Sequence, residues 1–341
     1  MADKLDERLH YACKYETEES VKECIDLGAN VNYKDSRGDT PLHLACRNRD
    51  DINPEIITTL LKNSCIPNEK NERGDTPLHL ACRNRDINPE IITTLLKNSC
   101  IPNEKNEEGD TPLHSACRNP DINTDIIITL LKNNYKPNEK NKEGDTPLHL
   151  ACKNLKIHPE VITTLLKNNC KPNEKNNEGD TPLHLACRNL EIHPEVTTTL
   201  LKNNCKPNEK NNEVDTPLHL VCSNFEIYQE VITTLLKNNC KPNEKNNEGD
   251  TPLHVVCRNL EIYPEVITTL RKNNCKPNEK NNEGDTPLHL ACRNDKIHMR
   301  NPEIITTLLM NNCKPNEKNN EVNKVNAFFL NKIENGNGEY M

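Results

Sequence analysis

A histidine and a cysteine recur together along this sequence, always three residues apart. His184 and Cys187 form one such pair, within the segment NEGDTPLHLACRN that spans 177–189. Imidazole nitrogens and thiolates are zinc ligands, and a thiol next to an imidazole is also the arrangement of a cysteine nucleophile with its base. Because residues three apart on a helix are neighbours, both side chains would face the same way. The pattern therefore raises metal binding or nucleophilic catalysis as the first question.

One pair is too small for either site. Zinc needs at least three protein ligands, and the next equivalents, His219 and Cys222, belong to the following copy of the motif. No Cys-x-x-Cys sequence is present, and no third polar group recurs that would orient the histidine as a base. We therefore predict no catalytic residue, no metal ligand and no cofactor, and we interpret the pair as architecture.

The motif is part of a long internal repeat. The sequence Asp-Thr-Pro-Leu-His begins at Asp39 and recurs seven times, the last copy beginning at Asp285. Such a period is typical of helical arrays, in which no unit can bury its apolar face alone. The composition agrees, because 33% hydrophobic and 3% aromatic residues in a chain of 341 would fill a single large core poorly.

Each copy encodes a short first helix. Thr181 supplies a hydroxyl for the N-cap, and Pro182 suits the first helical position. Leu183, Ala186 and Cys187 then share one face at three- and four-residue spacing.

A second helix follows, and a polar turn leads to the next copy. The second helix starts at a Pro-Glu pair and ends near Asn169, which favours a left-handed terminus. Gly179 occupies a turn position that requires positive φ. Val214 replaces this glycine in one copy, and we expect strain there. The apolar stripes of the second helix include Val161, Ile162, Leu165 and Leu166.

Thr-Pro-Leu-His-x-Ala is the signature of the ankyrin repeat, which the sequence resembles over about residues 5–319. The copies at Thr216 and Thr251 carry Val in place of Ala. The resemblance implies an all-α fold with short turn or hairpin segments, a single elongated ankyrin-repeat α-solenoid of about nine helix-turn-helix units. It also implies that His184 has a structural role near the Thr-Pro turn, and that Cys187 fills a small packed position.

The resemblance divides the chain into three parts. We expect residues 1–38 to form a degenerate N-terminal capping repeat, which lacks the Thr-Pro pair. Residues 39–319 hold eight tandem ankyrin repeats. Residues 320–341 hold a candidate C-terminal capping helix and a disordered tail.

Ankyrin repeats generally bind proteins through turn tips and exposed positions of the first helix, so the resemblance implies a non-catalytic interaction scaffold. These positions barely change between copies; they correspond to Lys175, Asn177, Glu178, Asp180, Arg188 and Asn189. The constancy has two interpretations. The lattice either matches a periodic partner or reflects recent internal duplication without a selected face.

Departures from the repeat are then the better candidates for partner binding, because interfaces depend on a few aromatic or arginine anchors. One group lies in two consecutive copies and comprises Phe225, Tyr228, Gln229, Tyr263 and Arg271. A second group lies at the N-terminal edge and comprises Arg49, Asp50, Arg85 and Asp86.

Charge and cysteine usage narrow the functional class. The net charge is −8, and basic residues are interspersed with acidic ones, so no nucleic-acid partner is expected. No apolar run has the length of a signal peptide or membrane span. An odd number of cysteines, seventeen, that follow the repeat indicates reduced thiols. We therefore expect an intracellular protein in the cytoplasm, or alternatively in the nucleus.

Two alternatives to a scaffold remain at this stage. The repeated Cys and His positions could serve a redox- or metal-responsive protein. The chain could also be an adaptor fragment that lacks its effector domain. The sequence leaves the partner's identity and the oligomeric state open.

Overall fold

The computed structural model describes residues 2–47, 53–84, 87–133, 135–189, 194–224, 229–258, 264–293 and 302–320. The chain divides into two compact units, Met1–Asn177 and Glu178–Met341. The predicted C-terminal capping helix within 320–341 lies outside the described residues, apart from Asn320. The division of the chain into the segments 1–38, 39–319 and 320–341 stays a prediction.

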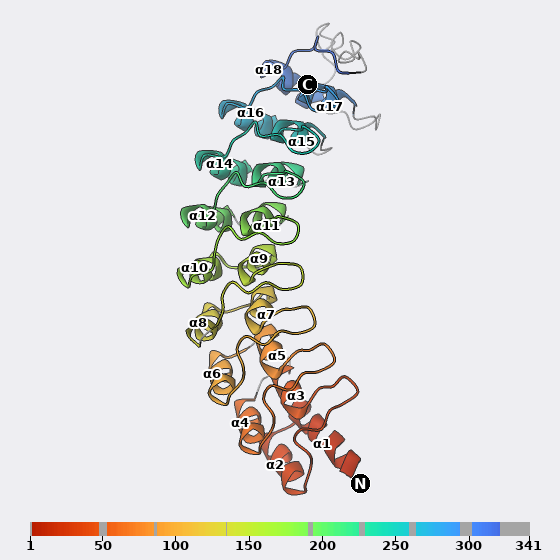
Figure 1. The fold of residues 1–341 in the computed structure, drawn as a ribbon, viewed down its shortest axis with the longest axis vertical. Coiled ribbons are helices and arrows are strands. Elements are labelled where there is room, and N and C mark those ends of the chain that lie inside the picture. The colour runs from red at the N-terminus through yellow and green to blue at the C-terminus, as the bar shows by residue number, and fades with distance from the viewer. Residues whose placement is uncertain are drawn as a thin grey trace. The chain divides into compact units, whose positions relative to one another are not determined.

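The first unit contains helices α1 to α10 within its described residues (Figure 1). Odd-numbered helices contact one another in a row, even-numbered helices form a second row, and α1·α2 and α3·α4 are examples of contacts between the rows. The helices are α1 (Ala2–Tyr15), α2 (Glu18–Asp26), α3 (Pro41–Arg47), α4 (Pro54–Lys62), α5 (Pro77–Arg83), α6 (Pro89–Lys97), α7 (Pro112–Arg118), α8 (Thr124–Lys132), α9 (Pro147–Lys153) and α10 (Pro159–Lys167).

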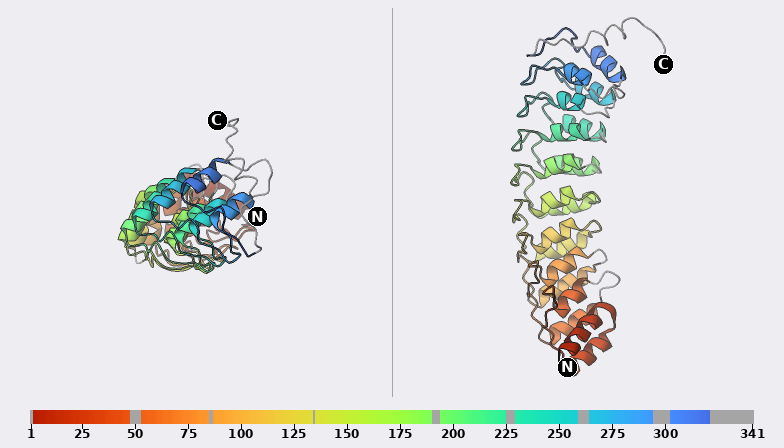
Figure 2. Two further views of the ribbon diagram at one scale, coloured as in Figure 1. Left: turned by 90° about the horizontal axis from the view of Figure 1, so that it is seen from above. Right: turned by 90° about the vertical axis from the view of Figure 1, so that its right-hand side faces the viewer.

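The second unit repeats this arrangement with helices α11 to α18. Here α11, α13, α15 and α17 form the first row, and α12, α14, α16 and α18 form the second. In each unit the polar turns between repeats extend from the same side of the helices (Figure 2). The helices are α11 (Pro182–Arg188), α12 (Pro194–Lys202), α13 (Pro217–Ser223), α14 (Gln229–Lys237), α15 (Pro252–Arg258), α16 (Pro264–Lys272), α17 (Pro287–Arg293) and α18 (Pro302–Met310).

The second helices bury one apolar stripe completely. Val161, Ile162 and Leu165 of α10 have no exposed surface, whereas Leu166 is partly exposed. Helices of nine residues are marginal alone in water, so contacts between successive repeats supply most of their stability. Asn169, after the end of α10, adopts a left-handed conformation with φ of 67°.

Helix lengths also bear on the membrane question. Among the described residues, no helix combines the length and the apolar character that a bilayer span requires.

Candidate functional site

The repeated histidine connects each repeat to the next. His219 on α13 is buried, and the Thr216 backbone N–H donates to its Nδ1 at 3.2 Å. The Thr216 hydroxyl lies 2.8 Å from the same nitrogen. Nε2 lies 3.1 Å from the carbonyl oxygen of Asp250, which can only accept, so Nε2 carries the proton. His184 repeats this geometry with Thr181 and Asp215. Both ring nitrogens are therefore occupied by structural hydrogen bonds.

The cysteines lie in the core. All seventeen are buried and free of disulfides. Burial raises the pKa of the Cys205 and Cys240 thiols to about 12, so at neutral pH they are protonated and poorly nucleophilic. Tyr135, which stands where the neighbouring copies of the repeat carry Cys100 and Cys170, is buried as well. Within the described residues, no three or more His, Cys, Asp or Glu side chains gather in a group able to hold a metal ion.

Buried, protonated thiols predict slow labelling. We expect the folded chain to react slowly with a thiol-specific disulfide reagent at pH 8, and all seventeen cysteines to react rapidly in urea. A reaction time course with and without urea measures this. Rapid labelling of a stoichiometric subset in the folded chain would instead support the redox alternative.

Within the described residues, the aspartate that starts the motif pairs with a basic residue at the end of the first helix in seven of the eight copies. Arg258 on α15 lies 2.6 Å from Asp250, and Arg293 on α17 lies 2.7 Å from Asp285. Both aspartates are buried. Asn281, from the next turn, donates to Asp250 at 2.8 Å. These carboxylates therefore stabilise the stack and are not exposed for partners.

The lysines of the turns also link successive repeats. Lys245 donates to the carbonyl oxygen of Lys280 at 2.7 Å and lies 3.4 Å from Glu279. Lys210 makes the equivalent contacts with Lys245 and Glu244. Part of the periodic surface lattice is thus explained by stacking alone, without any ligand.

Two of the turn and first-helix positions expected to contact partners are buried. Asp180 has no exposed surface, because it sits under Arg188 at 2.9 Å. Asn189, the C-cap residue of α11, is 8% exposed. Lys175, Asn177, Glu178 and Arg188 are exposed, as expected.

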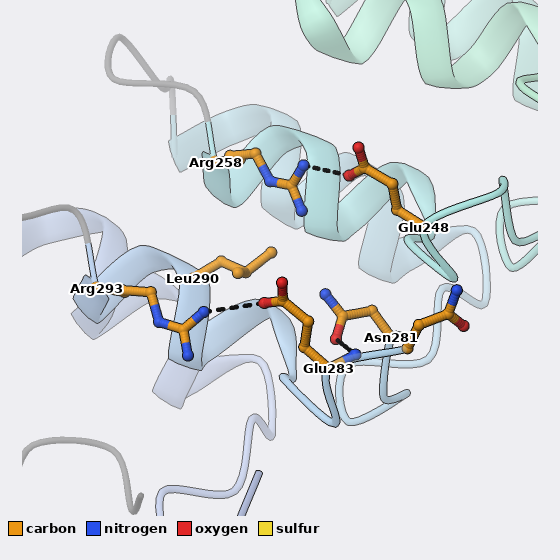
Figure 3. Close-up of a pocket in the computed structure, with 7 residues that line it drawn as sticks. Glu248, Arg258, Asn281, Glu283, Leu290 and Arg293 are labelled. Carbon is orange, nitrogen blue, oxygen red and sulfur yellow. Dashed lines mark hydrogen bonds and ion pairs between the residues drawn. The ribbon is translucent and has the colours of Figure 1, made fainter. Parts of the chain in front are cut away.

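A hollow in the second unit lies between the first helices and turns of two successive repeats (Figure 3). Its volume is about 500 Å³. Arg258 points towards Glu248 along one wall, and Arg293 pairs with Glu283 at 3.0 Å along the other. The apolar side chain of Leu290 lies between the two pairs. The lining residues are Glu248, Arg258, Asn281, Asn282, Glu283, Leu290 and Arg293. Leu290 is 7% exposed, so this lining presents mainly charged and amide groups to a polypeptide.

Most of the partner-binding candidates lie outside the described residues. These are Phe225, Tyr228, Tyr263, Arg49, Asp50, Arg85 and Asp86.

The two described candidates both contact the neighbouring repeat. Gln229, the first residue of α14, donates to the Thr269 hydroxyl at 3.1 Å. Arg271 on α16 donates to the carbonyl oxygens of Asn311, at 2.9 Å, and Cys275. Structural contacts between repeats therefore account for much of their hydrogen bonding.

An exposed aromatic pair lies on α1 and is not among the residues predicted from the sequence to bind a partner. Tyr11 and Tyr15 are 55% and 60% exposed, with ring centroids 5.0 Å apart. Lys14 lies over the Tyr15 ring, 4.7 Å from its centroid. The signal was available, because tyrosines four residues apart on a helix are neighbours.

Comparison with known proteins supports the resemblance. A family model described as ankyrin repeats (3 copies) matches residues 51–141, 121–211, 191–281 and 218–319, and one described as ankyrin repeats (many copies) matches residues 9–61. The crystal structure of the human ASB11 ankyrin repeat domain aligns at 24% identity with a TM-score of 0.58, covering 69% of this chain and 98% of that one. No curated protein matches the chain. The predicted ankyrin-repeat fold is confirmed.

Proposed function

Because the chain belongs to the ankyrin-repeat family, whose repeats are generally protein–protein interaction modules, we propose that it is a non-catalytic scaffold for a protein partner. The partner binds the surface formed by the first helices and the turns. The observation that carries this proposal is the open hollow lined by Glu248, Arg258, Glu283, Leu290 and Arg293. Arginines are enriched in protein interfaces, and the two arginines here are ion-paired at an open surface.

The repeated histidines and cysteines favour this proposal over redox or metal sensing. The ring nitrogens of His219 and the other motif histidines are used to join repeats. The thiols are buried, and burial raises the pKa of those such as Cys205 and Cys240. The proposal also includes an intracellular location, and it assigns Phe225, Tyr228 and Tyr263 as side chains that contact the partner.

Paired charge reversals on two faces of the second unit test the scaffold proposal. Glu248→Lys with Glu283→Lys changes two exposed carboxylates at the hollow. Glu195→Lys with Glu303→Lys makes the same net change at exposed residues of α12 and α18, in repeats other than those of Phe225, Tyr228 and Tyr263. We expect the first pair to reduce capture of a cross-linked partner by about tenfold, because like charges in an interface are costly. The second pair should leave capture unchanged.

The readout is quantitative affinity capture from cell extract, with the cross-linked sites mapped on the chain. Circular dichroism controls for folding of both variants. Equal loss in both pairs, or cross-links confined to the second helices, would contradict binding at the first-helix and turn surface.

A further inference from the structure

The repeat of α13 lacks the basic residue that pairs with the first aspartate of the motif in the other repeats. In the other described repeats of the motif, a basic side chain eight residues after the first aspartate pairs with it; in the repeat of α13 this position is Ser223. The Ser223 hydroxyl donates to the Leu220 carbonyl of its own helix at 2.7 Å. Among the described residues, no basic side chain forms an ion pair with Asp215 or Glu213.

The missing side chain opens the carboxylate to solvent. The equivalent aspartates of the other repeats, such as Asp180 and Asp250, are at most 1% exposed, whereas Asp215 is partly exposed. One oxygen of Asp215 accepts from Asn246 at 2.9 Å. Glu213, two residues earlier, is exposed. Asp215 and Glu213 can therefore accept hydrogen bonds from a partner, whereas the equivalent carboxylates of other repeats accept them from an arginine of the chain itself.

The neighbouring repeats show what fits between two such carboxylates. Arg188 lies 2.9 Å from Asp180 and 3.1 Å from Glu178. In the repeat of α17, Arg293 contacts the equivalent carboxylates, Asp285 and Glu283, at 2.7 and 3.0 Å. In both repeats, one arginine side chain therefore contacts an aspartate and the glutamate two residues before it. A guanidinium suits the pair because its several N–H donors can reach two carboxylates at once.

We propose that Asp215 and Glu213 receive an arginine side chain of the protein partner, which takes the place that Ser223 leaves vacant. This rests on the proposed scaffold function and specifies the chemistry of its partner as an arginine-bearing segment. The net charge of −8 favours the approach of a basic segment over long distances. The hollow lined by Glu248, Arg258 and Glu283 belongs to the following repeats of the same unit, where the rest of the segment would bind.

A peptide titration tests the site without knowledge of the natural partner. The probes are the capped peptide Gly-Gly-Arg-Gly-Gly and its citrulline counterpart, which has nearly the same shape but no charge. Backbone amide shifts of the isotope-labelled full chain report binding. We expect saturable shifts at Val214, Asp215 and Asn246 with the arginine peptide. The citrulline peptide should bind at least about tenfold more weakly, because it cannot form charge-assisted hydrogen bonds.

Two variants of the chain locate the peptide. Ser223→Arg fills the site from within and should abolish the shifts; it restores the residue that most of the other repeats carry, so folding is expected to persist. Arg188→Ser opens the equivalent position at Asp180 and should create a second set of shifts there. Glu213→Gln, a change at an exposed residue, should weaken binding without disturbing the fold.

The outcomes separate this inference from the scaffold proposal. Persistent binding to Ser223→Arg, or equal shifts in every repeat, would overturn the arginine site. Absence of peptide binding would overturn it too, yet capture sensitive to Glu248→Lys and Glu283→Lys would leave the scaffold function intact. Specific peptide binding together with insensitive capture would support the site and reject the proposed interface.

Discussion

Lowering the pH from 7.5 to 5 should strongly destabilise this protein. The reason is the series of buried motif histidines, whose neutral rings join successive repeats. Burial lowers the pKa of His114 and His254 to about 4, well below the ordinary value near 6.5. Burial also lowers the pKa of the other histidines for which a direction is known, namely His10, His43, His79 and His219.

The direction follows from proton binding in the two states. Above about pH 6.5 the rings are neutral in both states, so stability is fully present. Between about pH 6.5 and 4, His114 and His254 bind protons in the unfolded chain that they do not bind in the folded one, and stability is lost by up to about 1.4 kcal/mol per pH unit for each of the two. Burial raises the pKa of Asp180 and Asp250, which opposes this loss at the acidic end.

Urea unfolding monitored by circular dichroism between pH 7.5 and 4.5 measures the effect. The control is His114→Gln, which removes one titrating ring and should reduce the steepness of the pH dependence by about one proton. A urea midpoint that stays constant from pH 7.5 to 5 would show that the rings accept protons without unfolding.

Glycine in place of the turn valine should raise the free energy of unfolding, and valine in place of a turn glycine should lower it. Val214 has φ of 63°, in the left-handed region that β-branched residues avoid. Val214→Gly should therefore raise the free energy of unfolding by about 1 to 3 kcal/mol. Gly249→Val should lower it by at least as much, since a Cβ at Gly249 would lie 2.7 Å from the backbone nitrogen of Asn282.

The hydrogen bonds around Val214 already differ from those around Gly249. The Asn247 amide side chain lies 3.4 Å from the Asn212 carbonyl, whereas the equivalent contact of Asn282 with Asn247 is 2.8 Å. The valine thus loosens the contact with the next turn.

A matched pair of alanine variants separates the cost of backbone strain at positive φ from the cost of a clash with the next turn. Gly28 also has positive φ, but a Cβ there would meet nothing within 4 Å. Gly28→Ala should therefore cost only backbone strain, and Gly249→Ala should cost more. Thermal and urea midpoints provide the measurement. Equal losses at both glycines would mean that the approach of the next turn contributes nothing.

Sequence reasoning succeeded where the signal is local and repeated. The helix starts at Thr-Pro and at Pro-Glu, the left-handed Asn169, and the positive φ of Val214 all depend on residues within one repeat. The helix starts recur in several copies of the motif, and the repeated glycine of the turn predicts the positive φ of Val214.

The surface was predicted less well. Asp180 and Asn189 look like ordinary solvent-facing polar residues, yet Arg188 covers the first and the end of α11 encloses the second. The sequence contains both arginine and aspartate but does not indicate that a turn and a helix end, eight residues apart, meet in space.

By itself, the sequence determined the repeat, its helices, the family and the structural use of the His and Cys pair. Only the tertiary structure decided which polar residues are consumed in joining repeats, where the hollow beside Leu290 opens, and that Ser223 leaves Asp215 accessible. The physical reason is that helix starts and turns follow from preferences of neighbouring residues. The exposure of a charged side chain instead depends on which group from another turn or helix reaches it, and that depends on how the repeats pack.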